Sequence, residues 1–202
     1  MIRFLFFLSV FPQIAYGQDG IDKYSIYSLI INEELNQDGL NTKHIFIENK
    51  TGNPQGSESI YQIMDFVLSD MPILCSYPDK INELLAEFPV IKDLLITLDL
   101  TSQNNVSLEN SFNIDCQYSM ISRRKLNRLF KNSSFETWNK LRSNYPGLLG
   151  VIDFSDIVTK NGYAVVYYGL HKQALNAVGK IVILKKTKDD WVILSRSELW
   201  VS

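Results

Sequence analysis

Apolar residues recur every three or four positions after residue 20, which is the period of an amphipathic helix. Tyr24, Tyr27, Ile31 and Leu35 share one face at this spacing. The pattern therefore predicts a helix from about Ile21 to Leu35, with its apolar face turned toward the rest of the protein.

The period changes to two at 42–48, where alternation and β-forming residues predict a strand. The next stretch, 49–59, contains two glycines and a proline and predicts a loop. Local signals predict two further helices, one at 60–68 and one capped by Ser76 or Tyr77 with Pro78 in its first turn. Pro89 predicts a break in the second of these helices. The stretch 90–100 is either a helix or a strand, and 101–113 is predicted to be a loop with a short strand at its end.

Two helices are predicted in the next part of the chain, the first at 122–130. Ser133 and Glu136 form a capping box that begins the second. Its apolar face comprises Phe135, Trp138, Leu141 and Tyr145, and a Pro-Gly pair at 146–147 ends it.

From residue 148 onward the pattern is that of strands joined by short turns. The strands fall at 150–154, 163–168, 180–185, 191–194 and 198–201, and turn signals lie at 161–162 and 188–190. Without helices between them, such strands pair as an antiparallel meander. The run 163–168 is apolar on both faces, which predicts a central strand. The sequence thus predicts an α+β fold, with N-terminal helices packed on a C-terminal antiparallel β-meander of four to five strands.

The first 17 residues have the organisation of an export signal. Arg3 precedes the apolar run from Phe4 to Val10, and small residues at Ala15 and Gly17 suit a signal peptidase. We therefore expect 1–17 to be a signal peptide cleaved near Gly17 and 18–202 to form a single soluble domain, secreted or periplasmic. The run is too short to span a bilayer and no later run is long enough, so no membrane span is predicted.

Charge adds little to this picture. The formal net charge is −2, and loss of the leader with its one arginine changes it to about −3. This mild acidity predicts no general attraction to nucleic acid or to an anionic membrane. An apolar content of 46% indicates a globular chain rather than a disordered one.

The two cysteines, Cys75 and Cys116, both follow the leader. An even count in an exported chain favours a disulfide. The bridge would close a loop of about forty residues, worth roughly 3–4 kcal/mol in the loop-entropy model. Two buried thiols are the alternative.

Candidate catalytic residues are few. Asp153 lies on a predicted strand and His171 at a strand end, where a carboxylate and a general base could act. A surface loop position is the simpler interpretation of His171, and of His44. The two histidines have no metal-binding spacing, so no metal is predicted. The sequence has no P-loop, dinucleotide fingerprint or nucleophile elbow, and we predict no cofactor.

Aromatic residues are the candidates for ligand binding. Tyr163, Tyr167 and Trp191 lie on predicted strands and could line a pocket under a curved sheet, although core filling is the favoured interpretation for most such residues. A basic helix could dock an anionic polysaccharide, a lipid headgroup or an acidic partner, or could simply be a solvated face. Its residues are Arg123, Arg124, Lys125, Arg128 and Lys131.

The last third and the first helix carry a pattern that resembles a known group of proteins. The matching positions are Tyr24–Ile30, Trp138, Tyr145-Pro146, Gly150–Ile152, Phe154-Ser155, Ala164–Tyr167, Gly179, Ile183–Lys186, Trp191–Ile193 and Trp200–Ser202. The chain is similar to an uncharacterised group of exported bacterial proteins of Bacteroidetes type. The chain departs from the group at 169–179, where many members carry a cysteine pair. The same strands resemble the sheet of nuclear transport factor 2-like (NTF2-like) domains, at the level of fold only.

Three functions fit these observations. The leading hypothesis is an exported, non-enzymatic domain that binds a small molecule or an envelope or extracellular protein. A secreted hydrolase with Asp153 or His171 in a sheet pocket is the second. A structural component of the cell envelope is the third.

Overall fold

The fold was analysed in a computed structural model that describes residues 23–39, 42–52, 83, 85–102, 104–131 and 133–202. The predicted leader, the predicted helix at 60–68, the cap at 76–78 and Cys75 lie outside the described residues. The helices are α1 (Lys23–Asp38), α4 (Pro89–Thr101), α5 (Arg123–Leu129) and α6 (Ser134–Asn144).

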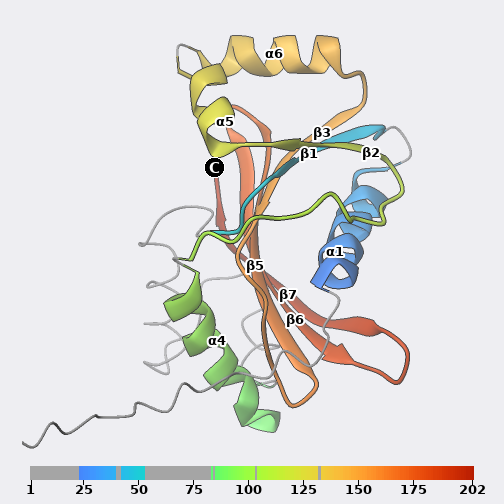
Figure 1. Ribbon diagram of the computed structural model, residues 1–202, viewed down its shortest axis with the longest axis vertical. Helices are drawn as coiled ribbons and strands as arrows, with labels where there is room; N and C mark the ends of the chain where they lie inside the picture. The colour runs from blue at the N-terminus through green and yellow to red at the C-terminus, as the bar shows by residue number, and fades with distance from the viewer. Residues whose placement is uncertain (1–22, 40–41, 53–82, 84, 103, 132) are drawn as a thin grey trace, which may run out of the picture.

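A seven-stranded mixed sheet forms the centre of the molecule (Figure 1). Six strands pair in the order β2-β1-β3-β5-β6-β7, and β4 pairs with β5 outside this path. β1 runs parallel to both β2 and β3, whereas the pairs from β3 through β7 are antiparallel. The strands are β1 (His44–Glu48), β2 (Gln117–Ile121), β3 (Leu148–Phe154), β4 (Val158–Lys160), β5 (Tyr163–Gln173), β6 (Asn176–Lys186) and β7 (Trp191–Val201).

The α+β class is confirmed, but the predicted meander of four to five strands is wrong in size and in strand direction. The antiparallel part exists, with β5 in the middle of the sheet as predicted. The sheet also recruits β1 and β2 in parallel, and β2 was not predicted because its positions are mostly half-buried and lack a strong pattern. The two runs predicted at 191–194 and 198–201 are one strand, β7. Register shifts opposite β6 interrupt its alternation.

The helix α1 covers one face of the sheet (Figure 1). Ile26, Tyr27, Ile30 and Ile31 are fully buried there, against strand residues that include Phe154. The predicted helix at 21–35 is therefore present and buries its apolar stripe.

The helix α4 covers part of the opposite face. Pro89 begins the helix, and Phe88 ahead of it has non-helical backbone angles (φ −128°, ψ 82°), so the chain breaks at this proline as predicted. The helix buries Ile91, Leu94 and Leu98 against β5 and β6.

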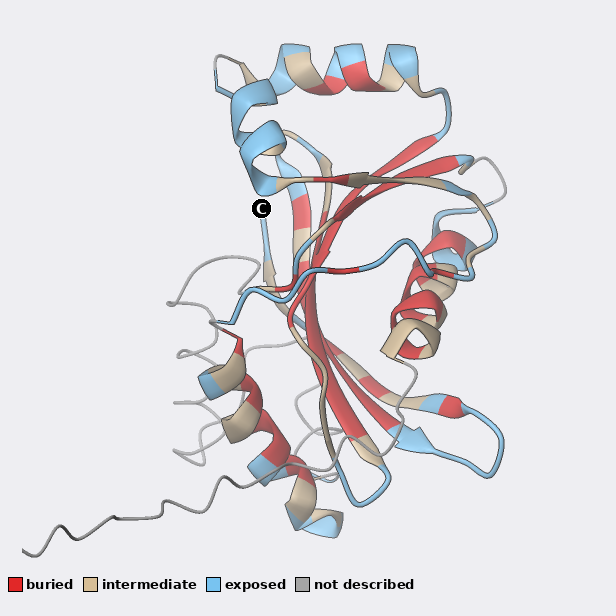
Figure 2. Ribbon diagram, in the orientation of Figure 1, coloured by how far each residue is buried: buried red, intermediate tan, exposed pale blue. Residues whose placement is uncertain are grey.

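The helices α5 and α6 lie at the other end of this second face. Ser133 accepts a hydrogen bond from the backbone N–H of Glu136 at 3.2 Å, which confirms the predicted start of α6. Trp138 and Leu141 are buried, but Phe135 is 69% exposed, so its predicted place on the buried face is wrong. No residue of α5 is buried, and its ribbon is drawn as exposed in Figure 2.

Candidate functional site

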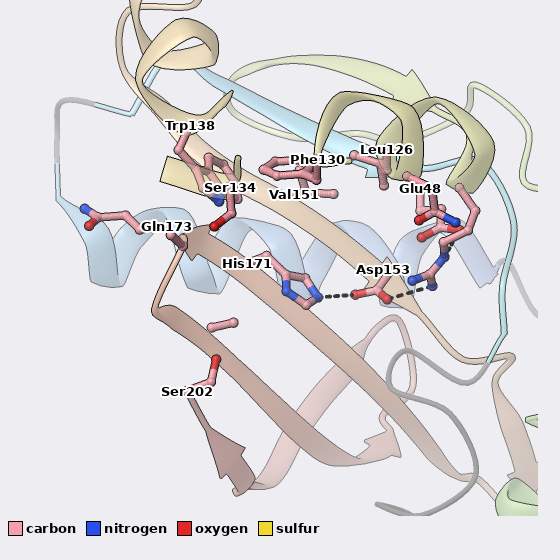
Figure 3. Close-up of a pocket in the computed structure, with 14 residues that line it drawn as sticks. Glu48, Leu126, Phe130, Ser134, Trp138, Val151, Asp153, His171, Gln173 and Ser202 are labelled. Carbon is pink, nitrogen blue, oxygen red and sulfur yellow. Dashed lines mark hydrogen bonds and ion pairs between the residues drawn. The ribbon is translucent and has the colours of Figure 1, made fainter. Parts of the chain in front are cut away.

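A pocket of about 250 Å³ lies between α5, the start of α6 and the sheet (Figure 3). Its floor comes from β1, β3 and β5, and the hairpin that joins β5 to β6 closes one side. One wall is apolar and consists of Leu126, Phe130, Trp138 and Val151. The rings of Phe130 and Trp138 pack together with centroids 5.2 Å apart.

The opposite end of the pocket is charged. Arg123 donates from Nε to Glu48 Oε1 at 2.8 Å and from Nη2 to Asp153 Oδ2 at 3.1 Å. The two acidic side chains are only 5% and 3% exposed, whereas the arginine side chain is half-exposed. Arg123 thus covers a pair of buried carboxylates from the solvent side.

His171 completes this cluster. Its Nε2 lies 3.5 Å from Asp153 Oδ1, and Figure 3 shows the imidazole beside this carboxylate in the pocket. One third of the His171 side chain is exposed. The structure therefore brings together the two residues that sequence reasoning named as catalytic candidates, and places them on adjacent strands.

The two carboxylates keep spare hydrogen-bonding capacity. Glu48 Oε2 and Asp153 Oδ1 are buried and accept no hydrogen bond from the described residues. Burial raises the pKa of Glu48, and the negative charge of Asp153 adds to the increase; the Arg123 guanidinium opposes both without cancelling them. Two buried carboxyl groups therefore share a single arginine.

Close backbone packing fixes the position of His171. Val151 in β3 pairs with His171 in β5, and Gly150 next to it lies against the same part of β5. A Cβ on Gly150 would overlap the backbone carbonyl oxygen of His171. Only glycine lets the two strands approach this closely at that point.

The ligand-binding candidates from the sequence lie elsewhere. Tyr167 is fully buried beneath α4, and Tyr163 is half-buried beside Phe88. Trp191 packs into the core on the α1 side. None of the predicted aromatic trio, Tyr163, Tyr167 and Trp191, lines the pocket with His171.

His44 and Cys116 lie in a second, more open depression of about 580 Å³. Burial lowers the pKa of His44, whose ring packs between Phe46 and Tyr145.

Burial raises the pKa of Cys116 to about 11, with a smaller contribution from Asp115, so its thiol is a poor nucleophile. Cys116 has a free thiol in the structure. Its predicted partner Cys75 lies outside the described residues, so the disulfide stays a prediction.

Two members of the charged cluster were missed or misread in the sequence. Arg123 belongs to the predicted basic helix, but its guanidinium binds the two carboxylates rather than forming part of a free basic face. Glu48 received no role. Its signal was available, because Phe46 and Glu48 are two residues apart on a predicted strand and share one face. A charged residue on the same face as a buried aromatic indicates a buried charge.

Among the described residues, no group of three or more His, Cys, Asp or Glu side chains could hold a metal ion. None of the helices in these ranges has the length and apolarity needed to cross a membrane.

Comparisons with protein-family models, with curated proteins and with solved structures found no match to the chain. The resemblance to exported Bacteroidetes-type proteins and to NTF2-like domains therefore stays a prediction.

Proposed function

We propose that the protein binds a small organic molecule in the pocket beneath α5, without catalysing its conversion. One observation carries the proposal: the pocket places the aromatic pair Phe130 and Trp138 opposite buried carboxylates with unused acceptor oxygens. Ligand pockets typically combine an apolar lining with a few convergent polar groups. The predicted leader would place this activity outside the cytoplasm.

The volume limits the size of the ligand. Pockets for drug-sized molecules have volumes of roughly 300–1,000 Å³, and this pocket has about 250 Å³. The ligand is therefore a fragment-sized molecule, or the compact end of a longer one.

A fragment library screened by ligand-observed NMR tests the proposal, with two hairpin variants as a matched pair. Ala174 lines the pocket, so Ala174→Phe fills it from the hairpin without removing core atoms. The next residue, Leu175, is 87% exposed and does not line the pocket, so Leu175→Phe adds a comparable aromatic ring outside it. We expect fragments that bind the wild type and the Leu175→Phe variant but not the Ala174→Phe variant. Equal binding to both variants would contradict the proposal.

Hydrolysis is a second candidate function, favoured by the 3.5 Å distance between His171 Nε2 and Asp153 Oδ1. In this scheme Asp153 orients the imidazole, and Nδ1 takes a proton from water while the hydroxide attacks an ester or amide carbonyl. The proton then passes to the leaving group.

A His171→Gln variant separates hydrolysis from binding. With p-nitrophenyl acetate as the probe, a hydrolase loses at least about a hundredfold in rate, which is the low end of what a positioned general base contributes. Equal rates for the wild type and the variant would exclude esterase activity toward this probe and leave the binding proposal untouched.

A further inference from the structure

We infer that the pocket selects an organic cation, a molecule whose ammonium group faces Glu48 and Asp153 while its apolar body lies against Phe130 and Trp138. This inference rests on the proposed function and adds the chemical class of the ligand. Three observations about the charged end carry it.

The first observation is the balance of charge. Glu48 and Asp153 carry two negative charges, and Arg123 supplies one positive charge to both through its Nε and Nη2 atoms. With a neutral His171, the four side chains have a formal charge of −1. A ligand with one positive charge neutralises the cluster, whereas an anion adds a third negative charge beside buried carboxylates.

The second observation concerns buried carboxylate oxygens that lack hydrogen-bond donors. Glu48 Oε2 has no hydrogen-bond donor among the described residues, and Asp153 Oδ1 has only the long 3.5 Å contact with His171 Nε2; both side chains are at least nine-tenths buried. Ionised carboxylates only accept hydrogen bonds, so the complementary ligand group is a donor. An ammonium supplies up to three N–H donors together with the missing charge.

The third observation concerns Arg123, the one lysine or arginine among the described residues that line the pocket. Its side chain is half-exposed, and both carboxylates already take its hydrogen bonds. A carboxylate ligand would have to compete with Glu48 and Asp153 for hydrogen bonds from the same guanidinium. The fold already holds both of these residues in contact with it. The arrangement therefore disfavours an anion at this end of the pocket.

Three probes of nearly equal size and shape test the inference: benzylamine as its ammonium ion, benzyl alcohol and benzoate. Titrations followed by NMR at about pH 8, where the carboxyl groups of model peptides are ionised, should give the order ammonium, alcohol, benzoate. We expect the ammonium to bind at least about tenfold more tightly than benzoate, because the pair of carboxylates attracts one and repels the other. Equal or tighter binding of the alcohol or of benzoate overturns the inference.

Isosteric variants locate the effect. Glu48→Gln and Asp153→Asn each remove one negative charge and should reduce the preference for the ammonium over the alcohol by about tenfold. Asp189→Asn removes a charge from an exposed turn and should leave the preference unchanged. An unchanged preference in both pocket variants overturns the inference. If neither pocket variant folds, the order of the three probes on the wild type decides alone.

Failure of the inference and failure of the proposed function have different results. If Ala174→Phe abolishes binding of neutral fragments while benzylammonium does not bind the wild type, the pocket function stands and cation selectivity is wrong. If no probe or fragment shows binding that Ala174→Phe abolishes, both are wrong.

Discussion

Tyr168 donates a hydrogen bond of 2.6 Å to Glu34, a buried carboxylate 134 positions earlier in the chain. The same oxygen of Glu34 also accepts from Lys180 Nζ at 3.0 Å, and Arg196 Nη1 lies 3.6 Å away. The negative charge of Glu34 and burial hold the pKa of Tyr168 well above its usual range, with burial as the larger cause. This network joins α1 to β5, β6 and β7 on the face opposite the pocket.

Replacement of Tyr168 by Phe removes one donor from this network. Glu34 keeps its hydrogen bond from Lys180, so the cost is that of one hydrogen bond to a charged group, about 1.5–3 kcal/mol. We expect the Tyr168→Phe free energy of unfolding, measured in urea, to fall by that amount. Tyr163→Phe is the control at a half-buried position on the same strand, and a change below about 0.5 kcal/mol is expected there. Similar losses in both variants would mean that the hydrogen bond to Glu34 contributes nothing specific.

The packing of α4 on the sheet is tested by a pair of leucines in one helix. Leu94 is 1% exposed and packs against β5 and β6, so Leu94→Ala should cost about 2–5 kcal/mol in the free energy of unfolding. Leu100, six residues later, is 72% exposed, and its replacement by Ala should change stability little. Thermal or chemical denaturation of both variants measures the difference. Comparable losses would contradict the placement of α4.

Gly150→Ala should alter both stability and the site. The added methyl group overlaps the backbone of β5 at His171, and overpacking of this kind typically costs about 1–3 kcal/mol. We also expect a shift of the His171 imidazole resonances in two-dimensional NMR, because β3 and β5 must separate at this point. Gly162→Ala is the control: its φ of 76° makes alanine unfavourable, but nothing surrounds the position and His171 is far along the strand. Unchanged His171 resonances in Gly150→Ala would show that the strands adjust elsewhere.

Two acidic residues should contribute to the pH dependence of stability with opposite signs. The pKa of Glu48 is raised in the folded protein, so folding favours its protonated form. The ionised carboxyl therefore lowers stability above the folded pKa, and this cost disappears as the pH falls below the unfolded value. Relative to Glu48→Gln, the wild type should become more stable as the pH is lowered from neutral to about 4.

Asp38 supplies the matched comparison. Burial alone would raise its pKa, but hydrogen bonds from Lys172 and Thr42 and the charge of Lys172 outweigh it and lower the pKa. Asp38 therefore stabilises the fold above its unfolded pKa and loses this effect as the pH falls through the lower, folded value. Relative to Asp38→Asn, the wild type should become less stable on acidification. Unfolding curves at several pH values measure both trends, and trends of equal sign would contradict this assignment.

Local signals in the sequence predicted the elements whose causes are local. The capping box at Ser133 and the break at Pro89 depend on hydrogen bonds and backbone angles within a few residues, and both appear in the structure. The parallel pairing of β1 with β2 and β3 depends on segments about 70 and 100 residues apart. No local period encodes that choice. The sequence therefore predicted the antiparallel C-terminal strands but not the parallel strands that complete the sheet.

The candidate site divides in the same way. Asp153 and His171 could be named from strand positions alone, because residues near strand ends often carry chemistry. Their proximity to Glu48 and Arg123 required the parallel strand β1 and the helix α5, which the predicted meander did not contain. The aromatic trio does not line this pocket, and the sequence could not show this because size and apolarity do not distinguish a ring in the core from a ring in a pocket.

The four ionisable side chains at the polar end of the pocket come from β1, α5, β3 and β5, which are spread over about 120 positions of the chain. Contacts between such distant segments form only when the long loops between them have closed, and this closure has an entropic cost. A partly folded chain in which these contacts are absent therefore lacks the binding site. A ligand that recognises these residues therefore binds the native protein in preference to its unfolded forms, and it stabilises the whole sheet by an amount that grows with the ratio of its concentration to its Kd.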